Sequence, residues 1–278
     1  MIYALKKFFD TNYNVLGFLY LTKLIFLDIE QLKYHFNKIY NVCNNSFIPG
    51  CGSYLFNGQE YIYNKEYYSK QKILYDVVKN KSDVLEIGVY MGHSILIMLL
   101  SNPNISITGI DIMDKYSFPA IKYLRDNFPK SRIDFINGDS LKILPNLIKK
   151  KRFDFFHIDG QHSNYYATKE FKYCMKINKT DLMSVLFDDI SQCKYLKENI
   201  LKNFNLKTQT TPVANDNLYL EIYINNVKSL IKFNIGCIGP NIKHKFIILC
   251  KKLISDQVRN RLKKKFPKII NKIKSYLF

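Results

Sequence analysis

The stretch Val84-Leu85-Glu86-Ile87-Gly88-Val89-Tyr90-Met91-Gly92-His93-Ser94 decides the fold of this 278-residue chain. Its first four residues are typical of a short buried strand, and His93–Leu100 is typical of an apolar helix. Gly88 and Gly92 lie between the two, where glycine lets the backbone turn tightly and approach a ligand closely. The spacing differs from the G-x-G-x-x-G of dinucleotide sites, and the chain has no G-x-x-x-x-G-K-[ST] phosphate loop. We therefore interpret the stretch as a strand, a ligand-binding turn and a helix.

An alternation of strands and helices follows this stretch. It predicts the α/β class: a doubly wound, Rossmann-like, mostly parallel seven-stranded sheet with an antiparallel last strand, flanked by helical N- and C-terminal extensions. In such sheets ligands bind at the carboxyl ends of the strands. The further predicted strands are Ile105–Ile110, Ile133–Ile136, Phe153–Ile158, Ser184–Phe187, Leu218–Ile224 and Ser229–Ile235. The predicted helices are one with a buried face of Phe118, Ile121, Leu124 and Phe128, and those over Leu141–Lys150, Tyr165–Ile177 and Tyr195–Phe204.

The chain divides into three parts by composition. Residues 1–70 are aromatic and irregular and are interpreted as a lid or acceptor segment, residues 71–240 as the α/β domain, and residues 241–278 as a basic amphipathic helical tail. Near the N-terminus, the apolar stretch Val15–Leu27 is interrupted by a lysine and is too short to span a bilayer. It lacks a signal-peptide cleavage site, so we interpret it as part of a buried helix over much of Leu16–Tyr40.

The formal charge of +19, from 42 basic and 23 acidic residues, is concentrated in the tail. Residues 243–278 hold twelve Lys and Arg and one acid, a net +11, which leaves +8 for residues 1–242. The tail is therefore predicted either to pack on the domain with a solvated basic face or to contact an anionic membrane surface or polymer. The richness in Lys, Ile, Asn and Tyr also fits an AT-rich genome, without a functional cause for the charge.

The six cysteines are scattered, with no C-x-x-C pair and no histidine at zinc-finger spacing. This pattern disfavours a zinc site and a disulfide framework. It predicts reduced thiols in a cytoplasmic protein, peripheral at a membrane if the tail binds lipid. The cysteines are Cys43, Cys51, Cys174, Cys193, Cys237 and Cys250.

Polar residues follow the next two strands at the same predicted edge. Asp111 ends the second strand, 25 positions after Glu86, where a carboxylate can accept both ribose hydroxyls of a nucleoside. Asp139 and Ser140 follow the third strand, where they can meet an adenine edge. Each acid alone is also what a helix N-cap requires. Polar residues at three successive strand ends indicate a nucleoside site rather than three separate caps.

Four motifs occur in order along residues 70–205: residues 84–94, Gly138-Asp139-Ser140, His157-Ile158-Asp159-Gly160-Gln161-His162-Ser163 and Leu186-Phe187-Asp188-Asp189. Together they resemble class I S-adenosylmethionine-dependent methyltransferases, and more narrowly the macrocin-type O-methyltransferase group, which modifies sugars on antibiotics and glycans. The resemblance implies S-adenosylmethionine as cofactor, with its methionine part near Glu86 and Gly88. It implies that Asp111 holds the ribose and that Asp139 and Ser140 approach the adenine. The other residues expected at the cofactor are Tyr90, Gly92, Ser94 and Asp159.

Three carboxylates are predicted to meet beyond the fourth and fifth strands: Asp159, Asp188 and Asp189. Carboxylates brought this close repel one another unless a cation is present, and oxygen ligands suit a hard ion such as Mg²⁺. In metal-dependent members of the resembled group the matching acids bind Mg²⁺, so the resemblance implies a Mg²⁺ site. The alternative is that Asp188 and Asp189 cap the following helix and Asp159 shapes a turn.

The implied chemistry is attack of a hydroxyl oxygen on the sulfonium methyl of the cofactor, which needs a base. His162 lies three residues after Asp159 and is predicted as that base, because an ordinary histidine pKa is about 6.5. Asp159 is the second predicted catalytic residue. Some relatives carry an acid at the position of Gln161, thought to be their base, and the amide here cannot take that role. His93 is expected to contact the cofactor or cap its helix, and His157 to be structural.

The sequence disfavours methylation of nucleic-acid bases. Residues 159–162 read Asp-Gly-Gln-His rather than Asn/Asp-Pro-Pro-aromatic, and no cysteine directly follows a proline. The leading hypothesis is O-methylation of a sugar hydroxyl in a glycan, nucleotide-sugar or lipid-linked saccharide. A catechol-type small-molecule methyltransferase, a ribose 2′-O-methyltransferase and a non-catalytic binding module of the same fold remain as alternatives. The sequence leaves a homo-oligomer open.

Overall fold

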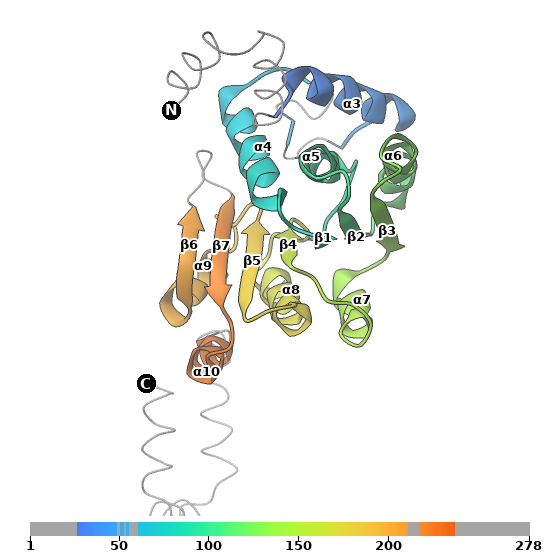
Figure 1. The fold of residues 1–278 in the computed structure, drawn as a ribbon. Coiled ribbons are helices and arrows are strands. Elements are labelled where there is room, and N and C mark those ends of the chain that lie inside the picture. The colour runs from blue at the N-terminus through green and yellow to red at the C-terminus, as the bar shows by residue number, and fades with distance from the viewer. Residues whose placement is uncertain (1–26, 49–50, 53, 56–60, 211–216, 237–278) are drawn as a thin grey trace, which may run out of the picture.

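A seven-stranded sheet forms the centre of the protein (Figure 1). The structure is a computed structural model that describes residues 27–48, 51–52, 54–55, 61–210 and 217–236. The strands are β1 (Asp83–Ile87), β2 (Ser106–Asp111), β3 (Arg132–Asn137), β4 (Phe155–Ile158), β5 (Leu182–Phe187), β6 (Asn205–Thr210) and β7 (Leu218–Tyr223). Their order across the sheet is β3-β2-β1-β4-β5-β7-β6. β1 to β5 pair in parallel, and β7 runs antiparallel to both β5 and β6.

Helices cover both faces of this sheet. On one face lie α3 (Ile29–Val42), α4 (Lys65–Val78), α5 (His93–Ser101) and α6 (Asp114–Asn127). On the other lie α7 (Ser140–Leu147), α8 (Asn164–Ile177), α9 (Lys194–Asn203) and α10 (Val227–Gly236). The predicted fold class is confirmed: the sheet is doubly wound and mostly parallel, and its last strand is antiparallel.

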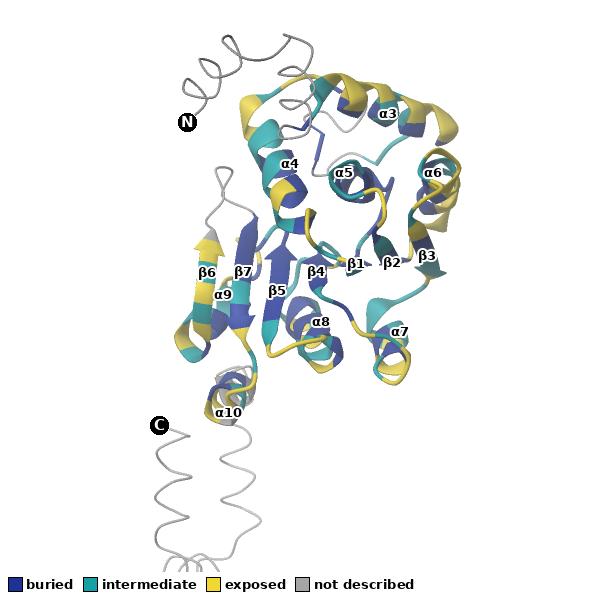
Figure 2. Ribbon diagram, viewed as in Figure 1, coloured by how far each residue is buried: buried dark blue, intermediate teal, exposed yellow. Residues whose placement is uncertain are grey.

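Each face of the sheet has its own apolar core, because successive side chains of a strand point to opposite sides. In β1, Val84 packs among the residues of α3 to α6, whereas Leu85 and Ile87 pack toward α7 to α10. The central strands β1, β4 and β5 are buried on both sides (Figure 2), as parallel strands covered by helices usually are. The carboxyl ends of these strands are therefore the places where the sheet meets a cavity.

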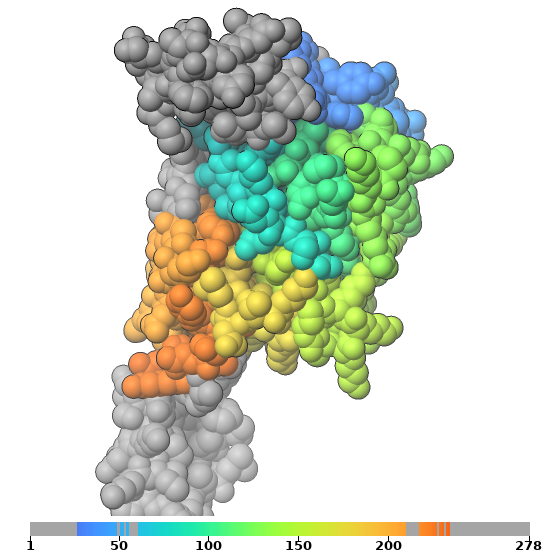
Figure 3. All heavy atoms as spheres, viewed as in Figure 1, coloured from blue at the N-terminus to red at the C-terminus, as the bar shows by residue number. Residues whose placement is uncertain are grey.

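Helix α4 joins the N-terminal part of the chain to the sheet. The side chain of Asn64 caps it by accepting hydrogen bonds from the backbone N–H groups of the next turn. Lys70, Leu74 and Val78, spaced four apart, are all buried on its inner face. In the space-filling view α4, in cyan, lies directly above the yellow and orange segments that hold β5 to β7 (Figure 3). The predicted division at residue 70 thus falls inside a helix that packs on the α/β domain.

The predicted strand over Ser229–Ile235 is wrong, because this segment lies in α10. The buried Phe233 and half-buried Leu230 are three positions apart, a spacing that fits a helix face as well as a short apolar run. β7 pairs instead with β6, which was not predicted. β6 reads Asn-Leu-Lys-Thr-Gln-Thr and lies at the sheet edge, so no apolar pattern marks it.

The predicted buried face of α6 is right in its centre and wrong at its start. Ile121 and Leu124 are buried as expected, but Phe118 is 54% exposed. Tyr116 and Ala120 complete the buried face instead. The buried face of α6 therefore runs beside Phe118 and leaves this ring at the surface.

The N-terminal and C-terminal predictions fall largely outside the described residues. In the described part, the helix predicted over Leu16–Tyr40 begins at Ile29, because Asp28 accepts hydrogen bonds from two N–H groups of its first turn. The apolar stretch before residue 27 and the tail at 241–278 lie outside the described residues. Within the described ranges, no helix combines the length and apolar character needed to cross a bilayer.

Phe171 tests the core on the α8 side of the sheet. Its ring is fully buried and contacts the rings of Phe187, Phe204 and Phe233. Phe171→Ala should lower the free energy of unfolding by about 3–5 kcal/mol, because it removes the ring and leaves a cavity. On the same helix Tyr165 is 62% exposed, so Tyr165→Ala should change the free energy of unfolding by less than about 0.5 kcal/mol. Urea unfolding followed by circular dichroism measures both, and equal losses would contradict this packing.

Candidate active site

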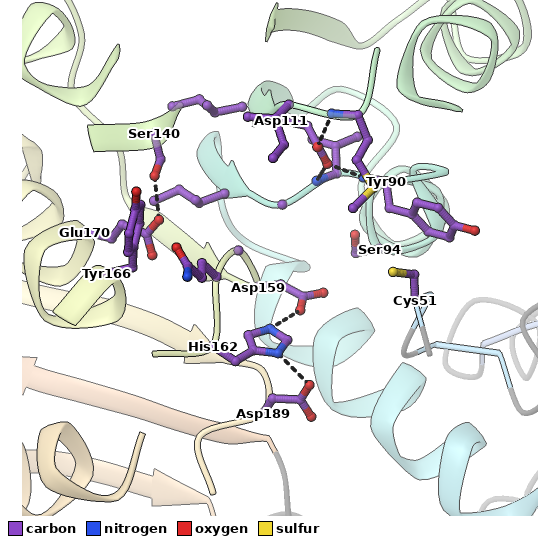
Figure 4. Close-up of a pocket in the computed structure, with 18 of the residues that line it drawn as sticks. Cys51, Tyr90, Ser94, Asp111, Ser140, Asp159, His162, Tyr166, Glu170 and Asp189 are labelled. Carbon is purple, nitrogen blue, oxygen red and sulfur yellow. Dashed lines mark hydrogen bonds and ion pairs between the residues drawn. The ribbon is translucent and has the colours of Figure 1, made fainter. Parts of the chain in front are cut away.

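A cavity of about 510 Å³ lies at the carboxyl ends of β1 to β4 (Figure 4). This is the edge where doubly wound sheets bind ligands. Of the predicted site residues, Glu86, Gly92 and Asp188 do not line it. The cavity is lined by the others: Gly88, Tyr90, Ser94, Asp111, Asp139, Ser140, Asp159, His162 and Asp189.

The turn after β1 depends on two glycines. Gly88 has a φ of +91°, and a Cβ added there would lie 2.0 Å from the carbonyl oxygen of Asp159. Since heavy atoms cannot approach so closely, a side chain at residue 88 would force apart the turns that follow β1 and β4. Gly92 has a φ of +68° and is the N-cap of α5. Its left-handed backbone lets the chain turn into α5, and Gly92 itself does not line the cavity.

Asp111 holds this turn through backbone hydrogen bonds. Its Oδ2 accepts from the N–H groups of Val89 at 2.6 Å and Tyr90 at 2.5 Å, and its Oδ1 accepts from that of Met113 at 2.7 Å. These donors occupy about three of the four lone-pair positions of the carboxylate. In this arrangement Asp111 has room for one ribose hydroxyl rather than the predicted two.

The predicted adenine end contains a buried acid that was not predicted. Asp139 caps α7 by accepting from the N–H of Leu141 at 2.9 Å, and it also lines the cavity. Ser140 donates from Oγ to Oε1 of Glu170 at 2.6 Å. Burial raises the pKa of Glu170 to about 7. The Oε2 atom of Glu170 has no hydrogen-bond partner among the described residues.

Glu86 lies beneath the cavity and supports it from below. Its fully buried carboxylate accepts from the hydroxyl of Ser94 and lies 2.9 Å from Nδ1 of His157. Nε2 of His157 lies 3.0 Å from the hydroxyl of Tyr54. Burial works to lower the pKa of His157, but the hydrogen bond with Glu86 and the nearby carboxylates outweigh it and raise the pKa. Glu86 and His157 therefore form a buried hydrogen-bonded pair, and Glu86 is linked to the cavity wall through Ser94.

His162 connects two of the predicted metal ligands. Its Nε2 lies 3.2 Å from Oδ1 of Asp159, and its Nδ1 lies 2.8 Å from Oδ2 of Asp189 (Figure 4). The hydrogen bonds to Asp159 and Asp189 raise the pKa of His162 to about 10. The ring is then a cation at neutral pH, with no lone pair free to accept a proton. This arrangement argues against the predicted role of His162 as the base.

Asp159 has the properties of a base at neutral pH. Burial, followed by the charge of Asp188, raises the pKa of Asp159 to about 7. A pKa near the working pH is the most effective for proton transfer. The side chain of Asp159 keeps 18% of its surface exposed and lines the cavity, so an acceptor can reach it.

The third predicted ligand, Asp188, points away from the cavity toward α4. Its side chain is 0% exposed, and Nζ of Lys70 lies 2.7 Å from its Oδ1 and 3.0 Å from its Oδ2. Oδ1 also accepts from the N–H of Asp189 at 2.9 Å. The three aspartates thus meet at the strand ends as predicted, but Asp159 and Asp189 share His162 while Asp188 pairs with Lys70.

The carboxylate oxygens at the strand ends are ligands that suit Mg²⁺, but their arrangement does not fit the ion. Ligand atoms of His157, Asp159 and Asp188 lie within 4.8 Å of one another. Both nitrogens of His157 already contact other side chains, and the carboxylate of Asp188 pairs with Lys70. Mg²⁺ needs near-octahedral oxygen ligands and usually keeps several waters. Asp188, sealed from solvent, offers no access for such a hydrated ion.

Sequence reasoning missed several residues of this site. Lys70 had a detectable signal, because it continues the buried stripe of Leu74 and Val78 along α4. Glu170 had one too, since it lies on the apolar face of α8 next to Phe171. Side chains that line the cavity without any such pattern are Cys51, Tyr54 and Tyr166.

The chain is similar in sequence to known methyltransferases. A family model described as O-methyltransferase matches residues 66–224. The chain is 35% identical over 91 residues to a putative caffeoyl-CoA O-methyltransferase of Arabidopsis thaliana, covering 32% of this chain and 39% of that protein. It is 29% identical over 89 residues to tapetum-specific methyltransferase 1 of the same plant, covering 31% and 38%. The matched segment spans about two fifths of the length of these curated relatives.

Solved structures share the fold. An O-methyltransferase from Bacillus cereus, solved with S-adenosylhomocysteine, matches with a TM-score of 0.52 and 15% identity over 68% of this chain and 90% of that one. The O-methyltransferase TomG from Streptomyces achromogenes, involved in tomaymycin synthesis and solved with S-adenosylmethionine, matches with a TM-score of 0.51 and 15% identity over 74% and 94%. At this identity the likeness concerns the fold alone.

His93, at the start of α5, provides a pH-dependent test of the cavity floor. Its ring is buried edge-on against Phe36, with ring centroids 5.0 Å apart, and burial lowers the pKa of His93 to about 3. The unfolded chain binds a proton here below about pH 6.5, whereas the folded chain does not. Stability should therefore fall by roughly 2 kcal/mol between pH 7 and pH 5 on account of this residue.

His93→Gln should lose this dependence, because glutamine does not titrate. Urea unfolding of both proteins at pH 7 and pH 5 measures the difference, whatever the baseline stability of the variant. If the two proteins lose stability in parallel, the buried neutral histidine is contradicted.

Proposed function

Because the chain belongs to the O-methyltransferase family, whose family model matches residues 66–224, we propose that it moves a methyl group from S-adenosylmethionine to a hydroxyl oxygen of a small molecule. One observation carries the proposal: Asp159, a carboxylate with a raised pKa, lies in the same cavity wall as the glycine turn after β1. When bound, the cofactor supplies an electrophilic methyl group on a sulfonium. The protein supplies binding, orientation and the removal of a proton.

The cavity suits a nucleoside cofactor. Its volume of about 510 Å³ is within the range of small-molecule sites. The absence of a side chain at Gly88 keeps the backbone close to the strand ends, and Asp111 offers an oxygen in the cavity wall. Asp139 and Ser140 present polar atoms beyond β3. We assign the methionine end to the side of Ser94, which is supported from below by Glu86.

Asp159 is the group that we assign as the base. Its pKa of about 7 lets the carboxylate accept the acceptor hydroxyl proton near neutral pH. His162 orients this carboxylate through the 3.2 Å contact. Its positive charge would also stabilise the negative charge that develops on the acceptor oxygen as the proton leaves. In this assignment the acid that some relatives carry at the position of Gln161 is not needed.

Mg²⁺ assistance, expected from the three aspartates, is not part of this mechanism. The carboxylate of Asp188 is buried against Lys70, and those of Asp159 and Asp189 both contact His162. Every step assigned above therefore uses groups of the chain itself.

The acceptor class is inferred from the relatives. The similarity to a putative caffeoyl-CoA O-methyltransferase favours an aromatic small molecule with a free hydroxyl. Tyr90 and Tyr166 line the cavity, and aromatic side chains pack well against such a ring. The second candidate is a sugar hydroxyl, which the motif at 159–163 favours through its resemblance to the macrocin-type group. Aromatic faces suit a sugar ring as well, so the acceptor has to be decided by experiment.

Cofactor binding is tested first at Asp111. Asp111→Asn replaces an acceptor oxygen by an NH₂ group facing the N–H groups of Val89 and Tyr90, so the turn should lose its shape. The affinity for S-adenosylhomocysteine should fall at least about tenfold, which is about 1.4 kcal/mol. The exposed Asp114 nearby serves as control, and Asp114→Asn should leave the affinity unchanged. Isothermal titration measures both variants, and no binding by the unaltered protein would end the cofactor proposal.

Turnover is tested with a panel of acceptors and S-adenosylmethionine labelled in its methyl group. The panel holds a catechol, caffeoyl-CoA, a nucleotide-sugar, a lipid-linked saccharide and an RNA. Transfer to the first two supports the aromatic acceptor, and transfer to the saccharides supports the sugar acceptor. Cofactor binding without transfer to any of them would favour a binding module.

With the acceptor identified, Asp159→Asn should lower the rate of transfer by roughly 100-fold or more, since the amide cannot accept a proton. In the unaltered protein the rate should rise with pH through about 7, as Asp159 ionises, and then level off. Affinity for S-adenosylhomocysteine should stay within a few fold. A variant that keeps its activity and its pH profile would show that another group is the base.

A further inference from the structure

Asp159, Asp188 and Asp189 form an acid cluster at the strand ends, and a lysine of the chain itself, Lys70, contacts one of these acids. Lys70 comes from α4, 118 positions before Asp188 in the sequence, and its ammonium contacts both carboxylate oxygens, at 2.7 and 3.0 Å. The two side chains are 9% and 0% exposed, so water screens this pair little. The ammonium also lies 5.0 Å from the ring centroid of Tyr54, a favourable cation–π position. Lys70 is thus held on two sides in a buried position.

The rest of the cluster is paired as well. The imidazole of His162 lies between Asp159 and Asp189, with one nitrogen near each carboxylate. Glu86 faces His157. Among the described residues, every carboxylate of the cluster therefore has a basic side chain within hydrogen-bond distance.

A divalent ion at these acids would have to compete with Lys70. A carboxylate can serve Mg²⁺ only with a lone pair directed at the ion, and the ion needs space for its remaining waters. Both oxygens of Asp188 face the ammonium, and the side chain has no exposed surface. Releasing Lys70 would leave it buried without a partner, which is strongly unfavourable.

From this geometry we infer that Lys70 takes the place of a divalent cation in the acid cluster, so that the active site needs no metal ion. The inference rests on the proposed function for its meaning in catalysis, but its test uses metal binding alone. Lys70 does not line the cavity, so it is a positioning residue. It offsets the charge of Asp188, while the other two acids, Asp159 and Asp189, line the cavity.

Metal binding by the unaltered protein is the first measurement. Mn²⁺ is the probe, because its electron paramagnetic resonance signal falls when the free ion is bound. The signal should stay that of free Mn²⁺ at millimolar concentrations of the ion. Tight, stoichiometric binding that Mg²⁺ displaces would overturn the inference.

Lys70→Met is the second measurement, because methionine keeps the length of the side chain and removes the charge. The variant should bind Mn²⁺ at least about tenfold more tightly than the unaltered protein, since the positive charge that competes with the ion for Asp188 is gone. The control is Lys72→Met, which removes a more exposed lysine from the same helix and should behave like the unaltered protein. A Lys70→Met variant with no gain in Mn²⁺ binding would overturn the inference.

Folding of the variant is read at the same time. Asp188 without its partner is a buried uncompensated charge, so the melting temperature of Lys70→Met should fall and should rise again when Mg²⁺ is added. The double variant Lys70→Met, Asp188→Asn has no such charge and should show no response to Mg²⁺. If the single variant is unfolded, recovery of its circular dichroism on adding Mg²⁺ supports the inference, and no recovery overturns it.

Titration with S-adenosylhomocysteine separates this inference from the proposed function. Cofactor binding by the unaltered protein without Mn²⁺ binding supports both. An absence of cofactor binding removes the proposed function, while the response of Lys70→Met to metal still decides the role of Lys70.

Discussion

Crowding of negative charge at one edge of the sheet is the constraint on which the rest of the site depends. The parallel strands β4 and β5 end side by side, and their first following residues are Asp159, Asp188 and Asp189. Like charges this close raise the free energy of the folded state unless cations offset them. The protein places Lys70 against Asp188 and His162 between the other two acids. Burial, followed by the charge of Asp188, raises the pKa of Asp159, and the hydrogen bonds to Asp159 and Asp189 raise the pKa of His162.

The same constraint ties the N-terminal helices to the chemistry. The cation for Asp188 comes from α4, and Tyr54, whose ring lies beside Lys70, also contacts His157. The segment before β1 is therefore part of the support of the site. α4 buries Leu74 and Val78 on the same stripe as Lys70, so the packing that attaches the helix also positions the ammonium. Stability and the electrostatics of the site are thus coupled through one helix.

The turn after β1 follows a different physical rule, that of close backbone approach. A Cβ at Gly88 would collide with the carbonyl oxygen of Asp159, and Asp111 accepts hydrogen bonds from two successive N–H groups of the turn. The turns after β1, β2 and β4 are consequently held together by backbone geometry rather than by long side chains. This is why the glycine spacing and the position of Asp111 were visible in the sequence. Both are local requirements of a strand–turn–helix unit.

The periodicity of apolar residues predicted most strands and helices of the fold. It failed in segments whose few apolar residues fit a strand and a helix equally well or form no pattern. The central strands are apolar on both faces and stood out, whereas the edge strand β6, with its polar residues, did not. Ser229–Ile235 was assigned to a strand because its few apolar residues fit two periods, and packing of Phe233 in the second core selects the helix. Phe118 shows the same limit. The apolar spacing predicts it on the buried face of α6, but in the structure it lies beside that face and is exposed.

The sequence by itself determined the α/β class, the ligand-binding edge and the convergence of the three aspartates, because strand ends in a parallel sheet meet at one edge whatever the helices do. Only the tertiary structure decided what neutralises those aspartates. The contact of His162 with Asp159 joins neighbours on one loop, but those of Lys70 with Asp188, 118 positions apart, and of His162 with Asp189 are pairings across the fold that no spacing along the chain encodes. The assignment of base and cation depends on these pairings, because the pKa of a buried group is set by its neighbours in space.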